Sequence, residues 1–405
     1  MIGQNQTLVL LTNEYPYGNS ETFLENEIPV LSKFFQEIII IPFSPKFNNV
    51  RETPRNVKVV FYKSKSKIGN LYLLKKAFVL LKILFSDFYY QNEKVKYIQN
   101  IRTYISIIKT TLFFSDTIDR LLKKKQLIKP LCYSYWLNAS AIAASVLIEK
   151  KALKALVCRV HGYDLYEERN KDRIIPFKYY VMKTANRIYA VSKHGSDYLQ
   201  KKNKFSEKVS VSYLGVNDNG SGPPLEAASF TIVSCSNIVP VKRVHFIAEA
   251  LKFIDFPMKW VHFGDGPGKK KVSEVIESLS SNVEVVLKGN VANEVVLNFF
   301  KDNPVNLFLN VSKSEGLPVS IMEAISFGVP VMATDVGGNS EIVTEKTGVL
   351  LPKDVGPELI GKHINNFRGT KMNSMEFRKN IRKVFFESFH AEKNYSEFAM
   401  EIKSY

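Results

Sequence analysis

The sequence has little cysteine and lacks the short motifs that mark several common protein classes. Its three cysteines, Cys132, Cys158 and Cys235, lie far apart in 405 residues, with no C-x-x-C pair and no histidine cluster. A sparse, odd number is typical of a reducing compartment and argues against a disulfide framework or a structural zinc site. The stretch FGDGPGKKK fails the Gly-x-Gly-x-x-Gly pattern because Lys269 stands at its last position, and no phosphate loop with Gly-Lys-Ser/Thr occurs.

Long apolar runs are also missing. The longest, from Leu71 to Phe85, is interrupted by Lys75, Lys76 and Lys82. It is shorter than the roughly 20 apolar residues that a membrane-spanning helix needs. The first residues show no basic leader followed by a cleavable apolar segment. We therefore expect neither a transmembrane helix nor a signal peptide, and a cytoplasmic location.

Acidic residues are scarce in the first half of the chain. The net charge is +17, and residues 1–220 carry all of it, because residues 221–405 hold equal numbers of basic and acidic side chains. Between Lys58 and Lys129 there are 16 basic and 4 acidic residues. This asymmetry indicates a surface for an anionic partner. Solvated helix faces in a lysine-rich protein are the alternative interpretation.

The order of apolar segments predicts two α/β domains. A strand at Thr7–Asn13, a helix capped by Ser20 and a strand at Glu37–Phe43 form one βαβ unit. Residues 68–130 are expected to be helical, and the alternation of strands and helices then resumes up to a strand at Val209–Val216. We expect an N-terminal domain over 1–216, a linker over 217–228, a C-terminal domain over 229–376, and a helical tail over 377–405 that packs back on the N-terminal domain. This pattern predicts a doubly wound parallel sheet in each domain, with a ligand cleft between the two.

The strongest chemical signal is the run NVSKSEGLPVSIMEAISFGVPVMATDVGGNSEIV, residues 310–343. Glu315 follows a strand, and Gly316, Leu317 and Pro318 lead into a helix that carries Glu323. Free N–H groups at a helix start can bind an anion or sugar hydroxyls. Because a carboxylate accepts hydrogen bonds from hydroxyls, the two glutamates suit a polyol ligand.

This run resembles the signature of the family 4 retaining glycosyltransferases, which have the GT-B fold of two Rossmann-like domains facing each other across a cleft. The match rests on the Glu-x7-Glu pair, the Gly-x-Pro, the later Gly-x-Pro-Val and the DVGG turn, all in register. The resemblance implies that Glu315 and the backbone of residues 316–318 hold the transferred sugar. It also implies that Glu323 hydrogen-bonds the ribose of the nucleotide.

Further segments of the second half are similar to the same family. In SNIVPVKRVHFIAEAL, residues 236–251, Lys242 falls on the family lysine that grips the diphosphate. Asn237 stands where an arginine is usual, and Arg243 is the candidate substitute. Asn290, in VLKGNV, falls near the base-binding turn. A Lys-Arg pair at a helix start is also commonly just a solvated basic patch.

The first half contributes a second group of candidates. RVHGYDLY, residues 159–166, ends a strand, and the family carries a His-Gly there that faces the donor across the cleft. His161 and Asp164 fit that pattern. The segment at residues 15–28 resembles the opening of the bacterial polysaccharide branch, and Gly18 and Asn19 would place backbone N–H groups near the leaving diphosphate.

The implied reaction moves a sugar, with retention, from a UDP- or GDP-sugar to a saccharide or lipid-linked saccharide in cell-surface polysaccharide synthesis, such as lipopolysaccharide O-antigen or capsule. His161, Glu315 and Lys242 are the expected catalytic residues. No Asp-x-Asp occurs, and the family needs neither a metal nor a cofactor. The basic, aromatic-rich residues 58–130 suggest a peripheral surface for the inner face of the membrane.

Three alternatives remain at this point. The fold also serves sugar-nucleotide epimerases and phosphorylases. The basic half would suit a nucleic-acid-binding protein, although no motif supports one. Asn237 at the usual arginine position leaves open a catalytically inactive subunit.

Overall fold

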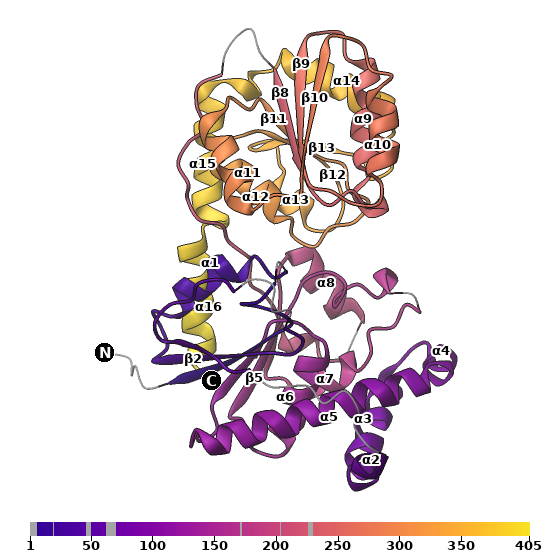
Figure 1. The fold of residues 1–405 in the computed structure, drawn as a ribbon, viewed down its shortest axis with the longest axis vertical. Coiled ribbons are helices and arrows are strands. Elements are labelled where there is room, and N and C mark those ends of the chain that lie inside the picture. The colour runs from indigo at the N-terminus through magenta and orange to yellow at the C-terminus, as the bar shows by residue number, and fades with distance from the viewer. Residues whose placement is uncertain are drawn as a thin grey trace. The chain divides into compact units, whose positions relative to one another are not determined.

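The chain forms two compact α/β units in the computed structural model (Figure 1). The structure describes residues 6–18, 20–45, 50–61, 70–170, 172–202, 204–225 and 230–405. The N-terminal unit comprises Met1–Ser212 and Tyr395–Tyr405, and the C-terminal unit comprises Tyr213–Asn394. The boundary thus lies at Ser212 rather than after residue 216. The expected tail is divided, because the stretch up to Asn394 belongs to the C-terminal unit.

The N-terminal unit is built on a seven-stranded sheet in the order β3-β2-β1-β4-β5-β6-β7. Every pair in it is parallel. The strand order reverses between β1 and β4, which is where ligands of such sheets bind. Its strands are β1 (Thr7–Thr12), β2 (Glu37–Pro42), β3 (Val57–Val59), β4 (Leu131–Ser134), β5 (Ala155–Val160), β6 (Arg187–Ala190) and β7 (Val209–Val211).

The C-terminal unit has a six-stranded parallel sheet in the order β10-β9-β8-β11-β12-β13. Here the order reverses between β8 and β11. Its strands are β8 (Thr231–Cys235), β9 (Met258–Phe263), β10 (Val283–Gly289), β11 (Leu307–Asn310), β12 (Val331–Thr334) and β13 (Gly348–Leu351). Two Rossmann-like α/β domains are therefore present, as the sequence predicted.

Helices connect the strands in both units. Those of the N-terminal unit are α1 (Leu24–Leu31), α2 (Asn70–Lys75), α3 (Ala77–Tyr90), α4 (Lys94–Gln99), α5 (Ile101–Lys124), α6 (Ala139–Glu149), α7 (Lys178–Thr184) and α8 (Lys193–Lys202). Those of the C-terminal unit are α9 (Val244–Ala250), α10 (Lys269–Ile276), α11 (Asn293–Asp302), α12 (Val319–Ser326), α13 (Asn339–Ile342), α14 (Pro357–Arg368) and α15 (Met375–Ser388). The last helix, α16 (Ala391–Lys403), begins in the C-terminal unit and ends in the N-terminal one. Among the described residues, no helix combines the length and the apolar character needed to cross a bilayer.

Both faces of the N-terminal sheet are buried, which explains why its strands are apolar at nearly every position. Successive side chains of a strand point to opposite faces. Val9 and Leu11 of β1 therefore pack with α5 and α6, whereas Leu8 and Leu10 pack with α1 and α16. Figure 1 shows the long helix α5 beside α6.

A buried ion pair lies on the face that α1 and α16 cover. Arg159 of β5 and Glu27 of α1 are both fully buried, with 3.3 Å between Arg159 Nη2 and Glu27 Oε1. Arg159 also donates from Nε to the Tyr133 hydroxyl at 2.7 Å. Its guanidinium lies 4.3 Å from the ring centre of Phe398 in α16. One arginine thus contacts the sheet, α1 and the C-terminal helix.

The first helix begins later than the sequence predicts. Ser20 is not its cap, because α1 begins at Leu24 and the Ser20 hydroxyl donates to Glu14 instead. Glu21 takes a left-handed conformation with φ of 57°. Its carboxylate accepts hydrogen bonds from three successive backbone N–H groups, those of residues 13, 14 and 15, at 2.7–2.8 Å. The expected N-cap is replaced by a carboxylate that folds back on the turn after β1.

Candidate active site

The candidate site of the C-terminal unit lies where its strand order reverses. β8 ends at Cys235 and β11 at Asn310, so the segments that follow them emerge at the same edge of the sheet. The first segment contains a short 3₁₀ helix, Pro240–Lys242. The second carries Glu315, and the Lys313 N–H ties it to the first by a 2.7 Å bond to the Val241 carbonyl. Residues about 70 positions apart thereby become neighbours.

Lys242 and Glu315 form an ion pair in this edge. Lys242 Nζ lies 2.7 Å from Glu315 Oε1 and 2.8 Å from Oε2. Asn310 Nδ2 donates to the same carboxylate at 3.2 Å. The Glu315 side chain is 8% exposed and that of Lys242 is 26% exposed. The carboxylate is therefore held in place, while the ammonium group keeps access to an incoming anion.

The DVGG turn fixes the backbone of Glu315. Gly337 has φ of 56°, and a Cβ built on it would lie 2.0 Å from the Glu315 carbonyl oxygen. The N–H of Gly338 donates to the Gly316 carbonyl at 2.8 Å. Only glycine permits both the left-handed backbone and this close approach. The motif after β12 thus positions the loop after β11.

Glu323 lies in the second turn of α12, which begins at Val319 with Pro318 as its N-cap residue. Burial raises the pKa of the Glu323 carboxyl to about 7, although the hydrogen bond from Asn293 acts in the opposite direction. The Asn293 amide donates to it at 2.9 Å. Burial raises the pKa of the Cys235 thiol to about 12. The charge of Glu323 also raises this pKa, whereas the charge of Lys242 lowers it. These two side chains therefore lie in one neighbourhood around the end of β8.

The raised pKa of Glu323 has a testable consequence for stability. The folded pKa of about 7 exceeds the ordinary 4.5, so the folded state holds a proton that the unfolded state releases between these values. The free energy of unfolding therefore falls as pH rises from about 4.5 to 7, by up to about 3 kcal/mol from this group. Glu323→Gln should remove this contribution to the slope of unfolding free energy against pH, as measured by urea unfolding across this pH range. Glu284→Gln, at a residue whose side chain is 62% exposed, is the matched control. An unchanged slope in the Glu323 variant would contradict the assignment.

Arg243 contacts three backbone carbonyls of its own unit. It takes a left-handed conformation with φ of 50°. Its guanidinium donates to the carbonyls of Val311 at 2.6 Å, Ser312 at 3.2 Å and Lys353 at 3.0 Å. In this structure it stabilises the loop after β11, and a direct contact with the donor stays a prediction. Lys242 is the cation that faces Glu315.

The remaining candidates of this unit lie around the same edge. Asn237 follows β8 and Asn290 follows β10, and both are exposed. Leu317 is 6% exposed, so its side chain is buried. The N–H groups of Val319 and Ser320, the first residues of α12, have no acceptor inside the helix. Donor contacts of these residues, and of Gly316 and Pro318, stay predictions.

In the N-terminal unit, His161 directly follows β5 and is 8% exposed. Both ring nitrogens are buried without a hydrogen-bond partner among the described residues. The ring packs against Tyr135 and Trp136, with centroid distances of 4.6 and 4.3 Å. Nδ1 lies 3.9 Å from Asp164 Oδ2, and contact of this ring with a donor stays a prediction.

Asp164 supports the turn that carries His161. Its carboxylate accepts from the N–H groups of His161 at 2.9 Å, Gly162 at 3.1 Å and Leu137 at 3.1 Å. It is 1% exposed. Asp164 thus holds the turn in place, and its contact with the donor stays a prediction.

Sequence reasoning missed an aromatic and amide cluster beside His161. Trp136 stacks on Tyr163 with ring centres 5.0 Å apart, and its indole N–H donates to Glu21 at 2.6 Å. Asn13, which directly follows β1, bonds Asn138 at 2.7 Å. Only their positions could have indicated these residues in the sequence. Each follows a strand or a turn at the sheet edge where the strand order reverses. Gly18 lies nearby in sequence with φ of 67°, and Asn19 lies outside the described residues.

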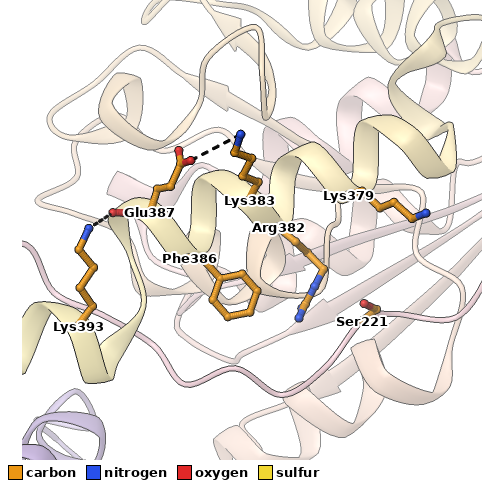
Figure 2. A pocket seen from close by; sticks show the side chains of 7 residues that line it. All are labelled: Ser221, Lys379, Arg382, Lys383, Phe386, Glu387 and Lys393. Atoms are coloured by element: carbon orange, nitrogen blue, oxygen red, sulfur yellow. Dashed lines mark hydrogen bonds and ion pairs between the residues drawn. The ribbon is translucent and has the colours of Figure 1, made fainter.

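One basic cavity in the C-terminal unit contains none of these residues. It has a volume of about 610 Å³ and lies along α15 (Figure 2). Its lining residues are Ser221, Lys379, Arg382, Lys383, Phe386, Glu387 and Lys393. Arg382 already binds Asp218 at 2.9 Å and the Gly220 carbonyl at 2.6 Å. This cavity is separate from the Lys242–Glu315 edge.

Known proteins resemble the chain in both sequence and fold. Residues 223–384 match the protein family described as glycosyl transferases group 1. The chain is 26% identical over 227 residues to WcaL of Escherichia coli K12, named as a colanic acid biosynthesis glycosyltransferase; the match covers 53% of this chain and 56% of WcaL. It is 25% identical over 294 residues to TuaC of Bacillus subtilis 168, named for teichuronic acid biosynthesis, covering 69% and 72% of the two chains.

The fold matches solved structures over nearly its whole length. The Anabaena protein HepE, solved in complex with UDP-glucose, superposes with a TM-score of 0.68 at 16% identity, covering 99% of this chain and 100% of HepE. A sucrose-phosphate synthase from Thermosynechococcus elongatus gives 0.72 at 14% identity, covering 99% of both chains. At this identity the likeness establishes the fold. Residues 223–384 therefore resemble the group 1 glycosyltransferase domain, within a chain that has two Rossmann-like domains like those of the solved structures it matches.

Proposed function

We propose that this protein transfers a sugar from a UDP- or GDP-sugar to a hydroxyl of a saccharide or lipid-linked saccharide, with retention of anomeric configuration. The names of WcaL and TuaC support a role in cell-surface polysaccharide synthesis, and the HepE complex supports a nucleotide-sugar donor. The observation that carries the proposal is the Lys242–Glu315 pair, with Glu323 nearby, at the edge where the strand order of the family domain reverses.

Each residue of the candidate site has its own proposed role in the reaction. The bond between the anomeric carbon and the β-phosphate oxygen breaks, and negative charge develops on the departing diphosphate. Lys242 stabilises that charge together with the N–H groups at the start of α12. The acceptor oxygen forms the new bond on the same face, and its proton passes to the departing phosphate oxygen. Glu315 orients the sugar hydroxyls, and Glu323 accepts from the ribose.

His161 and its supporting turn are proposed to form a donor-binding part of the N-terminal unit. Its ring nitrogens, which have no hydrogen-bond partner among the described residues, would bind the transferred sugar or a phosphate oxygen. Cationic side chains carry the leaving-group charge in this proposal, and no metal or cofactor is invoked. The proposed place of action is the cytoplasmic face of the membrane, where a lipid-linked acceptor would be reached.

A thermal-shift screen against UDP-, GDP-, ADP- and CDP-sugars tests the proposal first. A donor at a hundredfold excess over its dissociation constant should stabilise the folded state by about 2.7 kcal/mol. The donor that binds is then incubated with acceptor saccharides, and NMR of the product should show the anomeric configuration of the donor. Conversion of the donor sugar without any acceptor would instead indicate an epimerase. The absence of a shift with every nucleotide sugar would overturn the proposal.

A further inference from the structure

One face of helices α2 and α3 carries a row of large apolar side chains that are exposed. Each is between 61% and 81% exposed, and each follows the previous one by three or four residues, as on a single helix face. The row, called the α2–α3 stripe below, consists of Leu71, Leu74, Phe78, Leu81, Phe85 and Tyr89. Apolar surface gathered in this way marks an interaction site, whereas single exposed apolar residues need no explanation.

The opposite face of α3 is anchored, so the stripe cannot turn inward. Ile83 and Asp87 are fully buried. The Asp87 carboxylate accepts from the backbone N–H groups of Phe177 at 3.1 Å and Tyr179 at 3.0 Å, and from the Gln91 amide at 2.9 Å. These bonds join α3 to the start of α7. The orientation that exposes the stripe is therefore fixed by the core of the N-terminal unit.

Basic side chains outnumber acidic ones beside the stripe, although Asp116 of α5 pairs with Lys76 at 2.9 Å. Residues 70–99 contain five lysines and two acids. Of the acids, Asp87 is buried and Glu93 pairs with Lys96 at 3.2 Å. Lys75 and Lys82 are exposed between the apolar positions of the stripe, and Lys82 also pairs with Glu149 of α6 at 3.0 Å. An apolar face bordered by lysines suits the boundary between acyl chains and anionic headgroups.

A polar cavity lies at the end of the stripe, beyond Tyr89. Its volume is about 700 Å³, and three lysines but no acidic residue line it. The lining residues are Tyr89, Tyr90, Gln91, Asn92, Lys94, Tyr179, Lys201 and Lys204. Ammonium groups and tyrosine hydroxyls are donors for phosphate oxygens. The cavity, called the tyrosine–lysine cavity, thus has the chemistry of an anionic headgroup site.

We propose that the α2–α3 stripe inserts into the interface of an anionic phospholipid bilayer, and that the tyrosine–lysine cavity takes a phospholipid headgroup. A second copy of the chain is a poorer occupant, because stripe against stripe would bring like charges together. The bilayer offers apolar and negative groups at once. Holding the enzyme beside lipid-linked saccharides is a consequence that rests on the proposed function; the insertion itself does not.

Vesicle flotation of the full chain tests the insertion. We expect binding to vesicles of phosphatidylcholine with phosphatidylglycerol, weaker binding to phosphatidylcholine alone, and a decrease with salt. Phe78→Ser with Phe85→Ser should lower the partition coefficient roughly 100-fold, since each phenylalanine would lose its apolar burial. Lys201→Ala with Lys204→Ala should lower it roughly fivefold for each lysine. Ile128→Ser, at a residue that is 91% exposed but outside the stripe, should leave it unchanged.

Two further measurements separate the outcomes. Phe78→Trp should shift its fluorescence to the blue on the anionic vesicles, which reports insertion directly. Wild-type protein that does not bind, or a double serine variant that binds like wild type, would overturn the proposal. A dimer in solution that Phe78→Ser dissociates would overturn it in favour of a second copy. The donor-induced thermal shift, measured without vesicles, reports the proposed function separately.

Discussion

Lys242→Ala is expected to lower kcat for sugar transfer by roughly 100- to 1,000-fold, the usual effect of removing one group that stabilises developing charge. The reason is that Lys242 is the cation which lies 2.7 Å from Glu315 and stays partly exposed, whereas Arg243 is bound to three carbonyls. Steady-state kinetics with the donor found by thermal shift provides the measurement.

The matched control for this variant is Lys259→Ala. Lys259 also forms an ion pair, with Glu284 at 2.8 Å, but it lies on β9 away from the ends of β8 and β11. We expect kcat to change by less than about twofold there, because exposed pairs contribute little. An equal loss in both variants, or an active Lys242→Ala enzyme, would remove Lys242 from the catalytic residues.

Arg159→Met should lower the free energy of unfolding by about 3–5 kcal/mol, because it leaves Glu27 buried without a cationic partner. Burial already raises the pKa of the Glu27 carboxyl, and Arg159 opposes that rise. Without Arg159 the folded pKa moves further above the unfolded value, so the loss of stability should grow as pH rises. Urea unfolding at several pH values is the measurement.

Two variants control this experiment. Arg159→Met combined with Glu27→Gln removes the unpaired charge and should recover part of the loss. Lys123→Met breaks an exposed pair with Asp119, in which the lysine side chain is 75% exposed, and should cost about 0.5 kcal/mol or less. If Arg159→Met and Lys123→Met were equally mild, the buried pair would not stabilise the N-terminal unit.

The fold was largely predictable because both sheets are buried on two sides. Strands such as Thr7–Thr12 and Leu307–Asn310 therefore appear in the sequence as apolar runs. Shorter elements were missed. Strand β3 has three residues and α7 has seven, which gives too few positions for a periodic pattern to be recognised.

The residues of the candidate site also differ in how far they could be predicted from the sequence. Glu315 and Glu323 could be found because both lie on one short loop–helix segment, where spacing in sequence fixes spacing in structure. Asp164 was also named, but two hydrogen bonds could not be predicted because the partners are distant in sequence. The Trp136 indole donates to Glu21, and the Leu137 N–H donates to Asp164. The carbonyl contacts of Arg243 could not be predicted, because they depend on a left-handed backbone that turns the guanidinium onto the loop after β11.

We propose that a nucleotide sugar binds at the edge formed by the segments after β8 and β11. Hydrogen–deuterium exchange of the full chain, with and without the donor selected by thermal shift, tests it most directly. We predict slower exchange in peptides that cover residues 236–243 and 310–323. Protection confined to the basic cavity along α15, or no change in either segment at saturating donor, would contradict it.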